Sequence, residues 1–165
     1  FETLKKLVVF YSNEGNTRLI AEDIAISIGA DIMEIKPEKD VNSKGFFGYM
    51  IGGWQAIRGF KPPLKPLHKN PEEYEVIFVG TPIWAGRQTP AIKTFLEEHL
   101  PEGKKVAFFC THTGGAGSAL QNMRSISPEI EFLGDQEFLT SKKEERGLMV
   151  ASAMKWARSI VASIE

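Results

Sequence analysis

Residues 7–17 read LVVFYSNEGNT, so an apolar run is followed at once by a polar loop that contains glycine. The run at residues 7–11 does not alternate with polar residues, which is typical of a strand buried on both faces of a sheet. Beyond the loop, isoleucines recur at four-residue spacing as far as Gly29, and this pattern indicates a helix that ends at that glycine. The stretch therefore predicts a buried strand, a tight loop and a helix in direct succession.

Four more stretches have the composition of strands. Residues 76–79 (VIFV) and 106–110 (VAFFC) are continuous apolar runs like the first, whereas residues 31–35 (DIMEI) alternate and residues 131–139 (EFLGDQEFL) are interrupted by Gly134. Strands of this kind that alternate with helices form a parallel sheet covered on both faces. Thr89 and Pro90 begin one such helix, and residues 141–164 form a long C-terminal one, because apolar residues recur there at helical spacing.

The composition indicates one globular domain over residues 1–165. Hydrophobic residues make up 42% of the chain and charged residues 25%, and the formal net charge is −1. This near-neutral balance argues against a nucleic-acid partner. No apolar run approaches the ~18 residues of a membrane span, and the N-terminal residues have no secretory signal pattern, so we expect a cytoplasmic protein without a membrane span.

Residues 41–71 interrupt the alternation of strands and helices. They contain five Lys or Arg residues and no Asp or Glu. The first half places aromatic and apolar residues, from Phe47 to Ile57, at helical spacing, whereas residues 61–67 (KPPLKPL) contain three prolines and must run extended. One interpretation is a helix between two strands followed by a strap across the sheet edge. The other adds a positively charged surface near the ligand site that attracts an acidic partner or an anionic substrate.

In open parallel sheets, ligands bind beyond the carboxyl ends of the strands. After the first strand, Ser12, Asn16 and Thr17 offer side-chain donors, Gly15 permits a tight turn, and the following helix presents unpaired backbone N–H groups. Such a loop can hold a phosphate without a lysine, and a plain helix N-cap is the alternative. The loop has neither the Gly-Lys-Ser/Thr ending of a Walker loop nor the Gly-x-Gly-x-x-Gly pattern of dinucleotide sites.

The stretches after the next two apolar runs add an aromatic ring and more glycines. Trp84, in residues 80–90 (GTPIWAGRQTP), could stack on a planar cofactor or could equally cover the edge of the core. Residues 111–118 (THTGGAGS) combine three glycines with hydroxyl groups, which favours backbone N–H groups directed at a polar ligand. Together the three loops predict a ligand with a phosphate at one end and a planar ring with polar edges at the other, such as FMN.

The motifs YSNEGNT at residues 11–17, TPIWAG at residues 81–86 and THTGGAG at residues 111–117 resemble the three FMN-binding loops of the flavodoxin family. The resemblance covers essentially the whole chain. It implies an α/β fold with an open five-stranded parallel sheet of order 2-1-3-4-5 and helices on both faces. It also implies that FMN is bound non-covalently and that electrons pass to redox partner proteins.

By position, the resemblance implies three groups of cofactor-binding residues. The phosphate would be held by Ser12, Asn13, Glu14, Gly15, Asn16 and Thr17. The isoalloxazine ring, with Trp84 stacked on it, would lie against Thr81, Pro82, Ile83, Trp84, Ala85 and Gly86. The pyrimidine edge of the ring would contact Thr111, His112, Thr113, Gly114, Gly115 and Gly117. Glu14 stands where many relatives have Ser or Thr, so we expect its carboxylate to turn away from the phosphate while its backbone N–H binds.

Two residues near these loops, Cys110 and His112, are expected to have structural or surface positions rather than a chemical role. Cys110, the single cysteine, is expected to be a small buried hydrophobe, because it lacks the Cys-x5-Arg spacing of a phosphatase nucleophile. His112 is expected to face solvent, although it could touch the polar edge of a flavin. Two other functions stay open: an NAD(P)H-dependent FMN or quinone reductase on the same fold, and a non-redox interaction module that works through residues 41–71.

Overall fold

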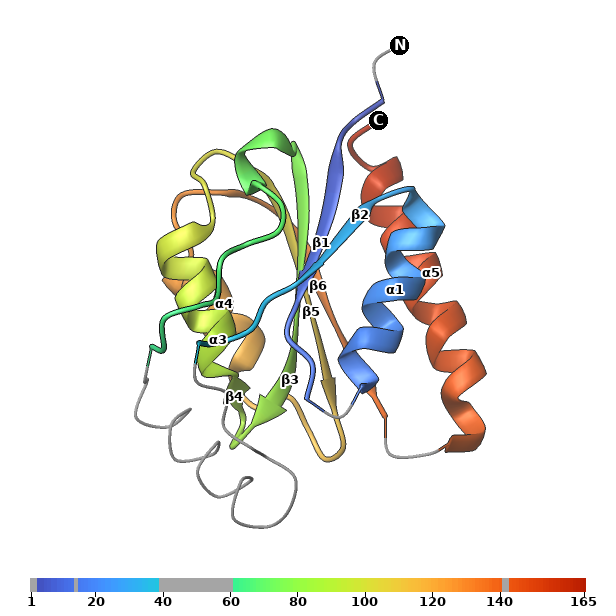
Figure 1. Cartoon of the computed structure of the whole chain (residues 1–165). Coiled ribbons are helices and arrows are strands. Elements are labelled where there is room, and N and C mark those ends of the chain that lie inside the picture. The colour runs from blue at the N-terminus through green and yellow to red at the C-terminus, as the bar shows by residue number, and fades with distance from the viewer. Residues whose placement is uncertain (1–2, 14, 39–60, 141–142) are drawn as a thin grey trace.

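A computed structural model of the chain describes residues 3–13, 15–38, 61–140 and 143–165. Five parallel strands form its centre, in the spatial order β2 (Asp31–Glu34), β1 (Lys6–Phe10), β3 (Val76–Trp84), β5 (Lys105–His112) and β6 (Glu131–Leu139) (Figure 1). The short strand β4 (Arg87–Gln88) pairs antiparallel with the end of β3. With β4 set aside, the five strands have the predicted order 2-1-3-4-5, so the predicted fold class is confirmed.

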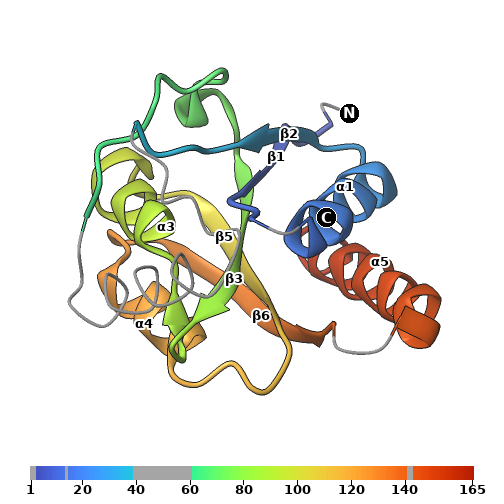
Figure 2. The same ribbon diagram turned by 60° about the horizontal axis from the view of Figure 1, so that its bottom comes forward.

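Helices cover both faces of the sheet. On one face, α1 (Asn16–Ile28) lies beside α5 (Arg146–Ala162), and on the other lie α3 (Pro90–Thr94) and α4 (Ala119–Ile126) (Figure 1, Figure 2). A π-helical turn (Phe95–His99) continues α3, and short 3-10 turns precede β3 (Pro71–Glu73) and α5 (Lys143–Glu145). None of the helices in the described ranges combines the length and the apolar character that a membrane span requires.

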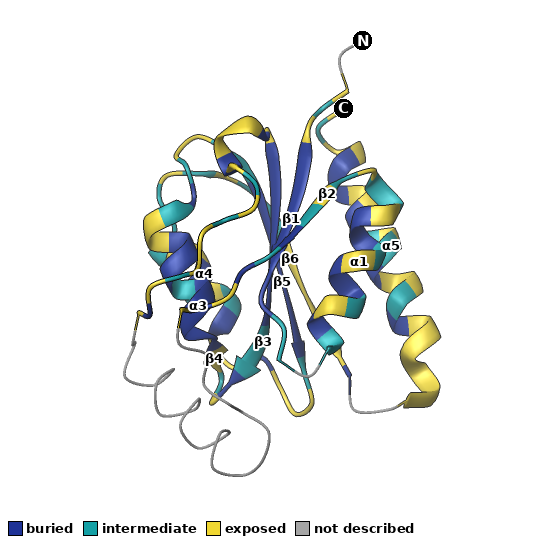
Figure 3. Ribbon diagram, in the orientation of Figure 1, coloured by how far each residue is buried: buried dark blue, intermediate teal, exposed yellow. Residues whose placement is uncertain are grey.

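The central strands are buried from both sides, which explains their unbroken apolar sequence. Leu7 and Val9 of β1 pack in the core layer beneath α3 and α4, and Val8 and Phe10 pack in the layer beneath α1 and α5. The sheet is accordingly buried along β1, β3 and β5, while the outward faces of the helices are exposed (Figure 3). Helix α1 ends at Gly29, as predicted, and this glycine adopts the left-handed conformation.

The structure corrects two element boundaries and adds one helix. β3 continues to Trp84, because residues up to Pro82 pair with β5 and the last two pair with β4, so the expectation of a loop directly after residue 79 is wrong. The C-terminal helix begins at Arg146 rather than at residue 141, since its buried positions start only at Met149. Helix α4 was not predicted, because only Ala119 and Met123 of its residues are buried and the apolar pattern is short.

The proline-rich stretch at residues 61–67 runs extended beside the edge of the sheet. Leu64 forms a bridge with Pro37, and the Lys65 N–H donates to the Lys36 carbonyl oxygen at 2.8 Å. The ammonium group of Lys61 pairs with Glu97 and Glu98, at 3.1 and 3.3 Å, so its charge is offset locally. The helix predicted from Phe47 to Ile57 lies outside the described residues, and the proposed positively charged surface stays a prediction.

Gly80 of β3 provides a test of the packing between the sheet and α5. A Cβ atom at residue 80 would lie 2.1 Å from the Cζ atom of Phe109, which is fully buried beside Trp156 of α5. We expect Gly80→Ala to lower the free energy of unfolding by about 1–3 kcal/mol, because the ring has no empty space to move into. Urea denaturation followed by circular dichroism measures this change.

The matched control is Gly147→Ala, because a Cβ atom there meets no atom within 4 Å and the residue lies within α5. We expect this variant to be neutral or stabilised by about 0.5–1 kcal/mol, since alanine is the better helix former. Equal stability of the two variants would contradict the packing described for Phe109.

Candidate functional site

The loops that follow β1, β3 and β5 meet at the carboxyl edge of the sheet, at the bottom of Figure 1 and turned forward in Figure 2. Two contacts join them. The hydroxyl oxygens of Thr17 and Thr111, both buried, lie 2.8 Å apart and connect the start of α1 to the end of β5. The backbone N–H of Ser118 donates to the carbonyl oxygen of Gly86 at 3.0 Å and connects the third loop to the turn after β3.

The first loop is organised around Ser12. Its hydroxyl oxygen accepts hydrogen bonds from the backbone N–H groups of Gly15, at 3.1 Å, and of Arg18, at 3.3 Å. The hydroxyl proton of Ser12 therefore stays available for donation to a ligand. Within the described part of the chain, no acceptor reaches the backbone N–H groups of Asn16 and Thr17, the first two residues of α1. Gly15 has a φ of +94°, which a residue with a side chain adopts only under strain.

The nearest basic side chain along the described chain, that of Arg18, is already paired. The guanidinium group of Arg18 is paired with the carboxylate of Glu34 and lies 5.6 Å from the ring centroid of Phe10. The electrostatic attraction for an anion would come instead from the start of the 13-residue helix α1, which has no acidic residue in its first turn. Asn13 is half-buried in the same loop, and Glu14 lies outside the described residues, so the expected direction of its carboxylate stays a prediction.

The second loop is a two-residue hairpin turn between β3 and β4. Ala85 and Gly86 have φ values of 52° and 73°, the left-handed pair that suits such turns. At the base of the hairpin, the buried hydroxyl of Thr81 donates to the Pro82 carbonyl oxygen at 2.8 Å and accepts from the Thr89 N–H at 3.1 Å. Thr81 therefore fixes the hairpin, and its hydroxyl is already engaged within the protein.

Trp84 ends β3 and belongs to the core layer beneath α3 and α4. Its side chain is 9% exposed, and its ring meets that of Tyr11 edge to face with 5.7 Å between centroids. This burial and ring contact support the alternative interpretation, in which Trp84 covers the edge of the core. The half-buried Pro82 and Ile83 lie beside it, and stacking of Trp84 on a flavin stays a prediction.

His112 does not face solvent, so that expectation is wrong. Its side chain is only 9% exposed, with Nε2 at 3.5 Å from a carboxylate oxygen of Glu137. Its Nδ1 accepts a hydrogen bond from the backbone N–H of Gly115 at 2.9 Å, which requires an unprotonated Nδ1. The hydrogen bond from Gly115 to His112 therefore fixes the conformation of the third loop.

The third loop combines exposed glycines with open backbone donors. A Cβ atom on Gly117 would lie 2.4 Å from the carbonyl oxygen of Gly86, so this close approach of two loops requires glycine. Among the described residues, no acceptor reaches the backbone N–H groups of Thr113, Gly114 and Gly117. These groups are the ones that the sequence predicts for a polar ring edge.

Gln88 of β4 is a polar residue of this region that the sequence analysis did not single out. It is 7% exposed, and its side-chain oxygen is buried without a hydrogen-bond partner. A glutamine beside a glycine turn is ordinary surface composition, so no sequence signal marks it. The burial follows from the pairing of β4 with β3 and from the packing of α4 against β4.

Cys110 is buried within β5, as expected, with no exposed surface. Burial, and then the carboxylates of Glu137 and Asp135, raise the pKa of its thiol to about 12. The thiol is therefore protonated at neutral pH and is a poor nucleophile.

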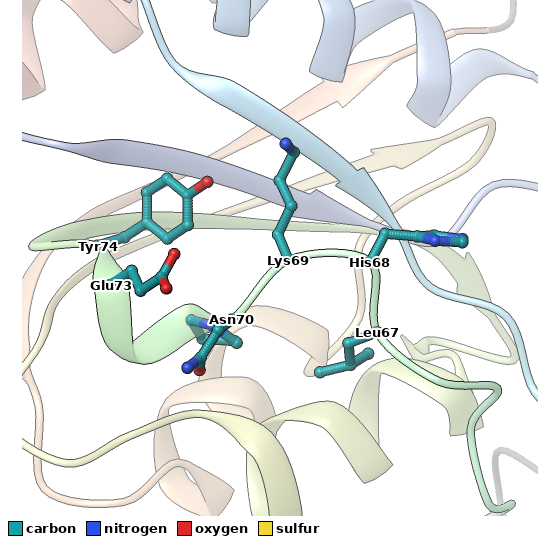
Figure 4. A pocket seen from close by; sticks show the side chains of 7 residues that line it. Leu67, His68, Lys69, Asn70, Glu73 and Tyr74 are labelled. Carbon is teal, nitrogen blue, oxygen red and sulfur yellow. The ribbon is translucent and has the colours of Figure 1, made fainter.

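A cavity of about 590 Å³ lies away from the three loops, at the edge where β3 begins (Figure 4). It is lined by residues 67–71 together with Glu73 and Tyr74. The hydroxyl of Tyr74 donates to Asp31 at 2.6 Å, and burial followed by this contact raises the pKa of Tyr74 to about 12. The cavity contains none of the residues that the sequence analysis assigned to the ligand site.

The Thr17–Thr111 pair can be tested by a double-mutant cycle. Thr17→Val and Thr111→Val each leave one buried hydroxyl without its partner, so each should lower the free energy of unfolding by about 1–3 kcal/mol. The double variant removes both hydroxyls and should cost less than the sum of the two single changes, by about 1 kcal/mol. Urea denaturation measures all four proteins, and strict additivity would contradict a direct bond between the two side chains.

Comparisons with known proteins agree with this architecture. A candidate flavoprotein from Bacteroides eggerthii superposes with a TM-score of 0.77 at 22% identity, covering 96% of this chain and 99% of that one. A flavoprotein from Lactobacillus acidophilus, solved in complex with FMN, gives 0.69 at 22% identity, covering 89% and 99%. The two-electron reduced flavodoxin of Megasphaera elsdenii gives 0.55 at 14% identity, covering 92% and 97%.

At these identities the likeness shows the fold alone, and no curated protein matches the chain. A model of the family described as Flavodoxin, however, matches residues 57–150, which is more than half of the sequence. That match includes two of the three predicted loops. Together with the strand order, it shows that this chain belongs to the flavodoxin family.

Proposed function

We propose that this protein binds FMN non-covalently at the carboxyl edge of its sheet and passes electrons between redox partner proteins. One observation carries the proposal: loops from β1 and β5 converge there with backbone N–H groups that have no acceptor in the described part of the chain. Open donors that lie together at one edge favour an anionic or carbonyl-rich ligand. Membership of the flavodoxin family supports FMN as that ligand.

The phosphate would be held at the first loop by neutral groups. The backbone N–H groups of Asn16 and Thr17 and the hydroxyl proton of Ser12 are available there, and the start of α1 adds the positive end of the helix dipole. Arg18 is already paired with Glu34, so we assign it no phosphate contact. These donors suit a dianion that several N–H and O–H groups can share.

The isoalloxazine ring would lie against the hairpin turn and the third loop, which touch each other at Gly86 and Gly117. Thr113 and Gly114 are exposed and present open N–H groups, which suit the carbonyl oxygens on the pyrimidine edge of the ring. The bond from Gly115 to His112 keeps this loop in one conformation. When FMN is bound, it would supply the electron chemistry, while these residues would set its potential by hydrogen bonding and by limiting water access.

The exposed residues at this edge fit a carrier that exchanges electrons with a docked partner protein, and a reductase on the same fold is the alternative. Ala85, Thr113 and Gly114 are exposed, which would leave part of the ring open to a partner protein. The absorbance spectrum of the purified protein, followed during addition of NADPH alone, tests the choice. Rapid bleaching of the flavin by NADPH would point to a reductase.

Asn16→Ala tests the phosphate end of the site. The change removes a side-chain donor beside the charged phosphate, so we expect FMN to bind about 10- to 100-fold more weakly, equivalent to about 1.5–3 kcal/mol. Fluorescence titration of the apoprotein with FMN measures the dissociation constant. Riboflavin, which has no phosphate, should bind the variant and the unaltered protein alike.

Asn70→Ala is the matched control, because Asn70 lines the cavity at the other edge of the sheet. FMN affinity should be unchanged in this variant. If Asn16→Ala also leaves FMN affinity unchanged, the first loop is only a helix cap and the proposed phosphate site is wrong.

A further inference from the structure

His112, the last residue of β5, receives a hydrogen bond that only an uncharged imidazole can accept. The backbone N–H of Gly115 donates to its Nδ1 atom at 2.9 Å, so Nδ1 carries no proton and the single proton of the neutral imidazole lies on Nε2. Histidine is the side chain whose charge changes between about pH 5 and 8. A proton that binds Nδ1 takes the lone pair that Gly115 uses. Protonation of His112 and this hydrogen bond therefore exclude each other.

The other nitrogen of His112 faces a group that favours the charged form. Its Nε2 atom lies 3.5 Å from a carboxylate oxygen of Glu137 on β6, and the His112 side chain is only 9% exposed. An imidazolium ion could keep this contact after the Gly115 N–H had left Nδ1. The imidazole thus lies between a backbone donor that requires the neutral form and a carboxylate that stabilises the charged form.

Few other charged groups surround this imidazole. Val106 and Phe108 belong to the core layer beneath α3 and α4, so by alternation along β5 the side chain of His112 lies on the same face. Neither β3 nor the third loop contains a charged residue. The charged residues of β6, α4 and the hairpin strand β4 are Glu131, Asp135, Glu137, Arg124 and Arg87. Among these, Glu137 is the acidic residue within ion-pair distance of the imidazole.

The part of the third loop that depends on the Gly115 bond is short. On one side, Thr140 fixes the backbone of His112, because its N–H and hydroxyl donate to the His112 carbonyl oxygen at 2.8 and 3.2 Å. On the other side, the Ser118 N–H donates to the carbonyl oxygen of Gly86. Between these points, a Cβ atom on Gly115 would meet nothing within 4 Å, so packing does not hold this glycine. Loss of the bond to His112 would free residues 113–115 alone.

We propose that His112 is a pH-sensitive switch of the third loop: its protonation releases Gly115 and frees residues 113–115, while the imidazolium ion stays beside Glu137. The proton comes from water and returns to water when the pH rises, so the switch needs neither a cofactor nor a co-reactant. The effect on FMN rests on the proposed function. The N–H groups of Thr113 and Gly114 would lose their fixed positions, so acid would weaken binding of the flavin.

An NMR titration of the apoprotein from about pH 8 to about pH 5 tests the switch. At the upper end, the nitrogen chemical shifts of His112 should report a neutral imidazole with its proton on Nε2. As His112 takes up a proton, the amide signal of Gly115 should shift with the same midpoint. The protection of that amide, corrected for the intrinsic effect of pH on exchange, should fall by about tenfold. An imidazole that titrates while the Gly115 amide stays unchanged would overturn the inference.

His112→Asn keeps an acceptor that does not titrate, because the asparagine oxygen can take the place of Nδ1 and is not protonated in this range. The amide signal of Gly115 should then be independent of pH. A Gly115 signal that still titrates in this variant would show that another group controls the loop and would overturn the assignment to His112.

Glu137→Gln removes the carboxylate beside Nε2. The imidazolium ion loses its stabilising partner, so the midpoint of the Gly115 transition should move to lower pH. Glu131→Gln is the matched control, because Glu131 lies at the other end of β6 and pairs with Lys105. This control should leave the midpoint where it is. Equal midpoints in the two variants would contradict the role of Glu137.

The effect on FMN is measured as the ratio of the dissociation constants of the unaltered protein and of His112→Asn, because this ratio cancels the titration of the FMN phosphate itself. The ratio should rise by about tenfold from about pH 8 to about pH 5. A constant ratio while Gly115 titrates would overturn the effect on FMN and the placement of the flavin at the third loop. Failure of the unaltered protein to bind FMN at any pH would overturn the proposed function alone, because the titration of the apoprotein decides the switch.

Discussion

Strands β1, β3 and β5 lie side by side in parallel register, and this pairing determines where the loops that follow them lie. Phe10, the last residue of β1, lies opposite Gly80, and Gly80 lies opposite Phe109 of β5. Strands paired in this way deliver the loops that follow them to one edge of the sheet. The buried Thr17–Thr111 hydroxyl pair then fixes α1 against β5 at that edge. Local features of the site, including the open N–H groups, follow from this arrangement.

The fold could be predicted from the sequence because strands buried on both faces leave an unbroken apolar signal, as residues 7–11 and 106–110 do. The edge of the sheet at which the three loops lie followed from the same signal. The end of β3 could not be predicted, because Thr81 and Pro82 interrupt the apolar run and the last two residues of the strand are held by pairing with β4. His112 is covered in part by Glu137, which is distant in the sequence. Gln88 is buried because β4 pairs with β3 and packs against α4, and no local sequence pattern predicts these contacts.

The basic side chains that the structure describes near the proposed phosphate site are already engaged in ion pairs. Arg18 is neutralised by Glu34, and Lys61 of the strap by Glu97 and Glu98. Neutral N–H groups bind a phosphate through directed hydrogen bonds whose strength depends little on salt at close range, in contrast to exposed charges. Backbone groups would therefore bind the cofactor, whereas exposed surface charges would mainly affect the rate of association with partner proteins.

Amide hydrogen exchange with and without FMN shows directly whether the three loops hold the cofactor. We expect rapid exchange in the apoprotein for the N–H groups of Asn16, Thr17, Thr113, Gly114 and Gly117, because they have no acceptor among the described residues. Bound FMN should slow these amides by at least about tenfold, while residues 67–74 around the distant cavity should not change. Protection around that cavity, with the loop amides unchanged in the FMN complex, would contradict the account.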